Sequence, residues 1–137
     1  MTRVVLDSNI FISALIFGGN PRQLIHLEEQ GLIELYTSEP LRREVEHVLV
    51  TKFAWPARKV ANATSYVWSL AQLVEPQRRV QDCINPDDNC VLECAIEAQA
   101  GWIVTGDQHL LALHPYRGIA IVTARDFLAR RAFETKR

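Results

Sequence analysis

Short β-branched or apolar runs alternate with stretches of helical hydrophobic period along almost the whole chain. The strand candidates are 3–6, 32–37, 102–105 and 119–122, with a briefer one beginning at Val74. Strand and helix in alternation favour βαβ units, because parallel strands need a crossover that is usually helical. The sequence therefore predicts an α/β fold, a three-layer α/β/α sandwich built on a mainly parallel sheet.

The helices expected between these strands follow from apolar spacing and capping residues. Leu41, Val45 and Leu49, for example, form an apolar stripe after the potential cap Ser38. Two boundaries are specific predictions. A helix opened by Pro56 should run through Leu73, and the helix that precedes strand 102–105 should end with Gly101 as its C-cap.

Composition indicates a soluble globular protein. The 137 residues, 48% hydrophobic and 23% charged, suit one domain over 1–137 with its own core. No apolar run approaches the roughly 18 residues that a membrane span needs, and the apolar start is too short for a secretory signal, so we expect a cytoplasmic protein. Three cysteines, an odd number, are expected to be reduced thiols buried in the core.

Net charge gives no hint of a nucleic-acid partner. At -1 the chain lacks the basic balance that often marks such proteins. Most of its cations are arginines, whose planar guanidinium suits phosphate, but solvated helix surfaces account better for most of them.

Carboxylates follow the predicted strands at the edge where open parallel sheets bind ligands. Asp7 comes directly after the first strand, and Asp107 comes after strand 102–105. Asp88 begins the preceding helix. Counting back from that helix's apolar residues places Asp88 on the inward face and Asp87 about 100° away. Glu44 borders the apolar stripe of its own helix, so a fourth carboxylate can reach the same edge.

Taken singly, Asp7, Asp88 and Asp107 are equally compatible with helix capping. Taken together they imply repulsion, roughly 4 kcal/mol for two charges about 4 Å apart at an effective dielectric near 20. A divalent cation offsets this, and an all-oxygen site suits Mg²⁺ or Mn²⁺. Such ions polarise a phosphoryl oxygen and lower the pKa of a bound water, which is the chemistry of phosphodiester hydrolysis.

Four ordered segments carry a resemblance to a known family. They are Val4-Val5-Leu6-Asp7-Ser8-Asn9, Ser38-Glu39-Pro40-Leu41-Arg42-Arg43-Glu44-Val45, Asn85-Pro86-Asp87-Asp88-Asn89-Cys90-Val91-Leu92-Glu93-Cys94-Ala95, and Ile103-Val104-Thr105-Gly106-Asp107-Gln108-His109-Leu110-Leu111. With these segments the chain resembles the PIN-domain ribonucleases, especially the toxins of VapC-type toxin-antitoxin modules, over nearly its whole length.

The resemblance implies a Rossmann-like sheet of about five strands, endonucleolytic cleavage of RNA with Mg²⁺ or Mn²⁺, a homodimer, and inhibition by a cognate antitoxin. It assigns catalytic and metal-binding roles to Asp7, Glu44, Asp88 and Asp107. Asn9 and Thr105 match polar residues of the same pocket, although either one also suits a simple turn-stabilising role. A catalytically silent RNA- or protein-binding module and a structure-specific DNA nuclease are the alternatives.

Overall fold

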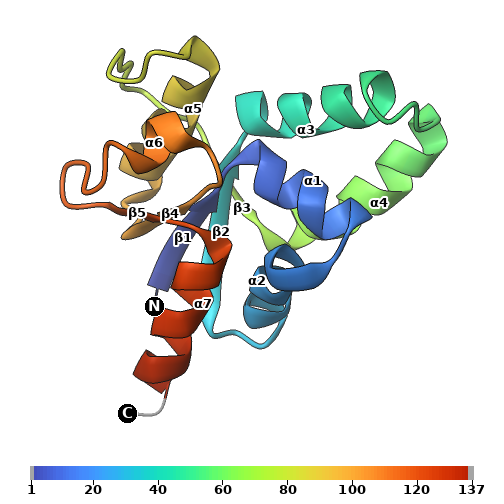
Figure 1. Ribbon diagram of the computed structural model, residues 1–137. Coiled ribbons are helices and arrows are strands. Elements are labelled where there is room, and N and C mark those ends of the chain that lie inside the picture. The colour runs from blue at the N-terminus through green and yellow to red at the C-terminus, as the bar shows by residue number, and fades with distance from the viewer. Residues whose placement is uncertain (1, 136–137) are drawn as a thin grey trace.

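The protein folds into a parallel five-stranded sheet with helices on both faces (Figure 1). The structure is a computed structural model and describes residues 2–135. The strands are β1 (Thr2–Leu6), β2 (Ile33–Ser38), β3 (Gln72–Val74), β4 (Trp102–Val104) and β5 (Ala120–Val122). The helices are α1 (Ser8–Ile16), α2 (Gly19–Glu29), α3 (Glu39–Thr51), α4 (Ala57–Leu70), α5 (Pro86–Ala98), α6 (Gln108–Leu111) and α7 (Ala124–Thr135). The predicted α/β/α architecture with a parallel sheet is confirmed. None of the helices within the described residues is long and apolar enough to cross a membrane.

Strand order places β1 at the centre of the sheet. The order is β3-β2-β1-β4-β5, and every neighbouring pair is parallel. The chain thus adds β2 and β3 on one side of β1, and then β4 and β5 on its other side. The carboxyl ends of β1 and β4 lie side by side at this reversal, with Leu6 opposite Val104. In open α/β sheets the loops diverge at such a point and leave room for a ligand.

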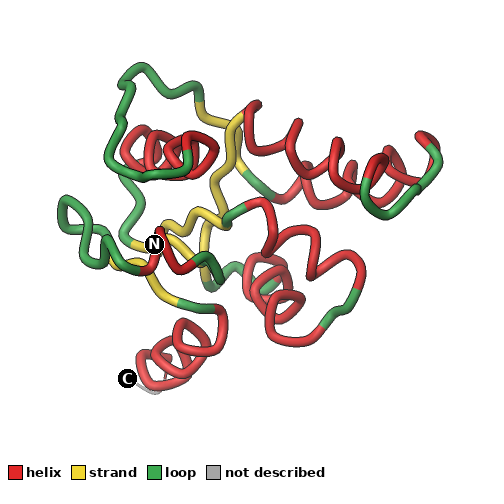
Figure 2. The backbone as a smooth tube through the Cα atoms, turned by 45° about the horizontal axis from the view of Figure 1, so that its top comes forward, coloured by secondary structure: helices red, strands yellow, loops and turns green. Residues whose placement is uncertain are grey.

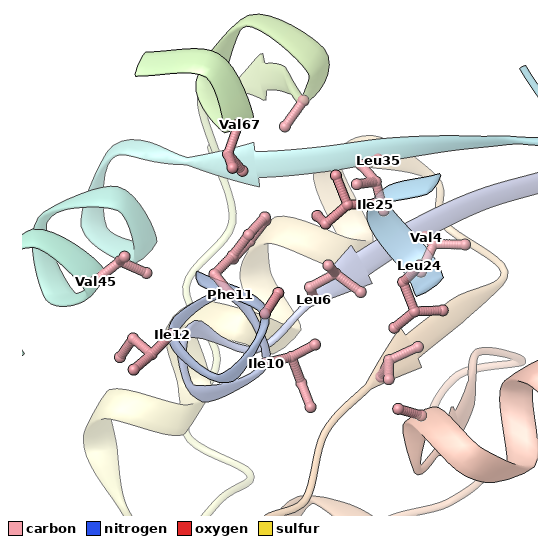
Figure 3. Close-up of a cluster of buried hydrophobic side chains, with 14 of the residues drawn as sticks. Val4, Leu6, Ile10, Phe11, Ile12, Leu24, Ile25, Leu35, Val45 and Val67 are labelled. Carbon is pink, nitrogen blue, oxygen red and sulfur yellow. The ribbon is translucent and has the colours of Figure 1, made fainter. Parts of the chain in front are cut away.

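The sheet separates two apolar cores. Alternate side chains of β1 serve both, because Val4 and Leu6 join one cluster and Val5 joins the other. Figure 3 shows the first cluster, in which Phe11 and other α1 side chains pack beside Leu6, with α2 side chains close by. The second cluster lies under α5. Burial of a central parallel strand on both faces accounts for its unbroken apolar run.

Helices α3 and α4 extend to one side of the sheet as an antiparallel pair, while Figure 2 shows helices on both sides of the strands. Trp68 of α4 is half-buried and forms a T-shaped pair with Phe11, with 5.2 Å between the ring centroids. The guanidinium of Arg42 from α3 lies over the Trp68 ring, 5.2 Å from its centroid. Trp68 therefore fixes α3 and α4 against α1.

Two predicted helix boundaries are wrong. Helix α4 ends at Leu70 rather than Leu73, because residues 72–74 pair with β2 as strand β3, and sheet pairing overrides the helical period there. Helix α5 is ended by Gln99, which adopts the left-handed conformation at φ 52°. Gly101 instead lies directly before β4 and donates its backbone N–H to the carbonyl of Arg3 in β1.

The three cysteines are free thiols, as the sequence predicts. Cys83 and Cys94 are buried, and Cys90 is half-buried. Burial raises the pKa of Cys94 to about 12, so this side chain stays a neutral thiol at physiological pH and acts as a small apolar residue.

Truncation of Phe11 tests how strongly the first core holds the fold. The side chain is fully buried, so Phe11→Ala should lower the free energy of unfolding by about 3–5 kcal/mol, the usual cost of such a cavity. Chemical denaturation measures this. Phe17→Ala is the matched control, because Phe17 follows the same helix and is 75% exposed, and it should change stability by less than about 0.5 kcal/mol. Equal effects would contradict the assignment of the core.

Candidate active site

Four carboxylates from separate segments gather where β1 and β4 end. Asp7 follows β1 at the cap position of α1, and Asp107 occupies the cap position of α6 shortly after β4. Asp88 lies in the first turn of α5, and Glu44 lies in α3. Each of the pairs Asp7–Asp107, Asp88–Asp107, Asp7–Asp88, Asp88–Glu44 and Asp7–Glu44 interacts electrostatically. The structure thus brings together all four acids that the sequence singled out.

Asp7 is the most buried acid of this group, with only 3% of its surface exposed. Its Oδ2 accepts a hydrogen bond of 2.7 Å from the Thr105 hydroxyl, and its Oδ1 accepts one of 3.3 Å from Ser8. Burial raises the pKa of Asp7, and these two hydrogen bonds act against that rise. The carboxylate is therefore held in one orientation by donors on two different strand ends.

Thr105 links Asp7 to Asp107. Its hydroxyl donates to Asp7 and accepts the backbone N–H of Asp107 at 3.0 Å. Asp107 Oδ1 in turn accepts the backbone N–H groups of His109 and Leu110, at 2.8 and 3.1 Å. Because Oδ1 caps helix α6, the orientation of the Asp107 carboxylate is fixed by the backbone.

Asp88 is almost buried, whereas its neighbour Asp87 is exposed, in agreement with the predicted helix faces. The thiol of Cys83 lies 3.8 Å from Asp88 Oδ2. Cys83 is positioned by Asn89, whose side chain accepts the N–H of Cys83 and donates to its carbonyl, at 2.9 and 3.3 Å. The hydrogen bonds between Cys83 and Asn89 thus hold the loop before α5 against this helix, next to Asp88.

Glu44 approaches the cluster from α3 and is half-buried. Ser8 lies between Asp7 and Glu44. Its hydroxyl donates to Asp7 and is also within hydrogen-bonding reach of the Glu44 carboxylate. Burial raises the pKa of Glu44, and the charges of Asp7 and Asp87 raise it further. Asp87 therefore contributes charge at the rim of the cluster although it points away from its centre.

The pKa of Asp88 shows the effect of burying several carboxylates close together. Burial raises its pKa from 3.8 to about 6, and the charges of Asp107, Asp7 and Glu44 add to the rise. A carboxyl group in this state is ionised at neutral pH against the repulsion of its neighbours. A bound cation would remove that repulsion.

The donor set fits a divalent metal ion. Asp88, Asp107 and His109 each offer one ligand atom, and the three atoms lie within 4.8 Å of one another. Two ligands on opposite sides of an ion with bonds of about 2.1 Å are about 4.2 Å apart, so small side-chain rotations suffice for coordination. Carboxylate oxygens suit Mg²⁺ and Mn²⁺.

Several contacts of this cluster were not predicted from the sequence. Ser8 and His109 each neighbour a predicted acid along the chain, and that adjacency was the available signal. Cys83 reaches Asp88 only through its loop, which nothing in the spacing of the cysteines indicates. Asn9 is exposed in the first turn of α1, and the hydrogen bonds that the four acids accept within residues 2–135 come from other groups.

A sequence model of the PIN domain family matches residues 3–109, which span all four acids. Among curated proteins, the chain is similar to the uncharacterized protein MJ1680 of Methanocaldococcus jannaschii. The two are 29% identical over 116 residues, which cover 81% of this chain and 74% of the relative.

Two solved structures share the fold. One is PAE2754 from Pyrobaculum aerophilum, with a TM-score of 0.67 at 13% identity over 96% of this chain and 90% of that one. The other is VapBC2 from Rickettsia felis bound to a DNA fragment from its promoter, with a TM-score of 0.62 at 12% identity over 88% of this chain and 97% of that one. At such low identity the likeness establishes the fold alone.

The raised pKa of Asp88 predicts how stability depends on pH in metal-free protein. Since this pKa is higher in the folded chain than its ordinary value of 3.8, the stability that the protonated carboxyl gives is full below about pH 4 and is lost as pH rises through about 6. Asp88→Asn removes that loss. The variant should exceed the wild type in free energy of unfolding at pH 8 by on the order of 1–2 kcal/mol, after allowance for solvent screening.

Urea unfolding in the presence of a chelator at pH 4 and pH 8 measures this difference. Asp87→Asn is the matched control, because Asp87 is the adjacent residue but is exposed, and its gain at pH 8 should be smaller. An Asp88→Asn variant that is no more stable than the wild type at pH 8 would contradict the electrostatic account.

Proposed function

Because the chain belongs to the PIN domain family, whose members are typically nucleases, we propose that it is a metal-dependent endoribonuclease acting at Asp7, Glu44, Asp88 and Asp107. The observation that carries the proposal is the convergence of these four acids, from four segments of the chain, at the reversal point of the sheet. Helix capping explains Asp107 in part, but it explains neither the burial of Asp7 and Asp88 nor their mutual repulsion.

The acids would hold Mg²⁺ or Mn²⁺. When bound, such an ion supplies Lewis-acid polarisation of a phosphoryl oxygen and lowers the pKa of a coordinated water. The chain's own contribution is to fix its ligands in advance. Thr105 and Ser8 orient Asp7, backbone N–H groups orient Asp107, and the fastened Cys83 loop confines Asp88. Preorganised ligands need little rearrangement when the substrate phosphate arrives.

RNA is the proposed substrate on the strength of the four family-like segments rather than of charge, since the net charge is only -1. Through the family resemblance, the same segments support a toxin role with a cognate antitoxin as partner. The family resemblance also supports a homodimer.

Cleavage of a labelled single-stranded RNA with Mn²⁺ or Mg²⁺ tests the proposal. Asp7→Asn should reduce the rate at least about 100-fold, equivalent to roughly 3 kcal/mol of transition-state stabilisation, because it removes a metal-binding charge but preserves shape. Asp126→Asn, which alters an exposed acid in the first turn of α7, is the matched control and should cleave normally.

The same preparations should be tested on flap DNA of equivalent sequence. Metal-dependent cleavage of DNA but not RNA would reassign the enzyme as a structure-specific DNA nuclease. RNA binding without cleavage would identify a silent module. Cleavage that persists at the wild-type rate in Asp7→Asn would refute the acidic site.

Thr105→Val tests the hydroxyl that joins Asp7 to Asp107. The substitution keeps the shape of the side chain, which is fully buried, but removes both of its hydrogen bonds. Loss of a group that orients metal ligands typically costs about 10–100-fold, and we expect this drop in Mn²⁺ affinity by calorimetry and in cleavage rate. Thr105→Ser retains the hydroxyl and should restore most of both. Wild-type behaviour of Thr105→Val would show that the link is dispensable.

A further inference from the structure

His109 is placed against the acidic cluster by the same turn that positions Asp107. The backbone N–H of His109 donates to Asp107 Oδ1, which holds the histidine at the start of α6. Its ring nitrogen Nδ1 lies 4.0 Å from the same oxygen. The side chain is 59% exposed, so its rotamer can change without disturbing a packed core.

A second observation connects this imidazole to Asp88, on a different segment. One ligand atom each from Asp88, Asp107 and His109 falls within 4.8 Å of the others. Asp88 comes from the first turn of α5, far from the other two in sequence. The fold therefore assembles a mixed group of two carboxylates and one imidazole.

The other three histidines are placed differently. His26 pairs with Glu29 within α2 at 2.7 Å, and His114 Nδ1 accepts the backbone N–H of Ile121. His47 is exposed on α3. Among the histidines of the part of the chain that the structure describes, only His109 belongs to a group of potential metal ligands.

We propose that His109 supplies an imidazole nitrogen to the cation held by Asp88 and Asp107, and that this nitrogen makes the site favour Mn²⁺ over Mg²⁺. The inference rests on the metal site of the proposed function and adds a ligand to it. Mg²⁺ strongly prefers oxygen ligands and keeps several waters, whereas imidazole suits first-row transition metals. The carboxylates supply charge for either ion, and the imidazole discriminates between them.

Electron spin-echo modulation of Mn²⁺ bound to the full chain detects a directly coordinated nitrogen without any measurement of activity. Wild-type protein should show nitrogen modulation that changes character when histidine is labelled with ¹⁵N. His109→Ala should abolish the modulation. His26→Ala is the matched control and should retain it, since His26 contacts Glu29 and not the acidic cluster.

Calorimetric titration of the same variants measures selectivity. His109→Ala should raise the Mn²⁺ dissociation constant at least about 10-fold, as loss of a group that supports a metal site typically does, and should change the Mg²⁺ constant much less. His109→Gln offers an amide oxygen in place of nitrogen and should also lose the preference for Mn²⁺. Circular dichroism verifies that both variants are folded.

The outcomes separate this inference from the function on which it rests. Mn²⁺ binding with no nitrogen modulation, or with unchanged affinity in His109→Ala, would overturn the role of His109 and leave the acidic ribonuclease site intact. Failure of the wild-type protein to bind Mn²⁺ and Mg²⁺ at all would overturn both.

Discussion

The rest of the structure has to hold together four carboxylates that repel one another near the ends of β1 and β4. Asp7 and Asp88 are removed from water and lie near the charges of Asp107 and Glu44, so their pKa values are raised, that of Asp88 to about 6. A chain selected only for stability would neutralise or expose these groups. Their gathering at one edge of the sheet lowers stability, and a bound ligand of opposite charge would offset that cost.

The scaffold holds Asp7 and Asp107 in place despite this repulsion because both follow strands at the centre of the sheet, whereas α5 and α3 carry Asp88 and Glu44. β1 is the central strand, apolar on both faces, and it pairs in register with β4 up to the residue before Asp7. Beyond the sheet, the backbone of Asp7 continues the ladder through a 3.0 Å hydrogen bond to Val104, and Thr105 joins the two acidic turns. Packing on both faces thus fixes the carboxylates, and local hydrogen bonds orient them.

Much of this arrangement is predictable from sequence because it depends on short-range rules. Strand runs such as 3–6 predict the architecture, the helical spacing around Asp88 predicts the inward face of α5, and the strand ends predict the positions of Asp7 and Asp107. The predicted ends of α4 and α5 are wrong because they depend on contacts between residues far apart in the sequence. Residues 72–74 have helical spacing but pair with β2 as strand β3. Gln99, two residues before the predicted Gly101, ends α5 in the left-handed conformation, and Gly101 donates its N–H to the Arg3 carbonyl. The approach of Cys83 and His109 to the acids likewise depends on side-chain geometry that spacing does not encode.

The central claim is that the acids at this edge of the sheet form a binding site for a divalent cation. Anomalous diffraction from crystals of the protein soaked in Mn²⁺ tests it most directly, because the ion is located without reference to activity. The account predicts a strong anomalous peak within coordination distance of Asp88 and Asp107, and its loss in Asp88→Asn crystals. Crystals with Mn²⁺ bound elsewhere, or with no peak at these acids, would contradict it.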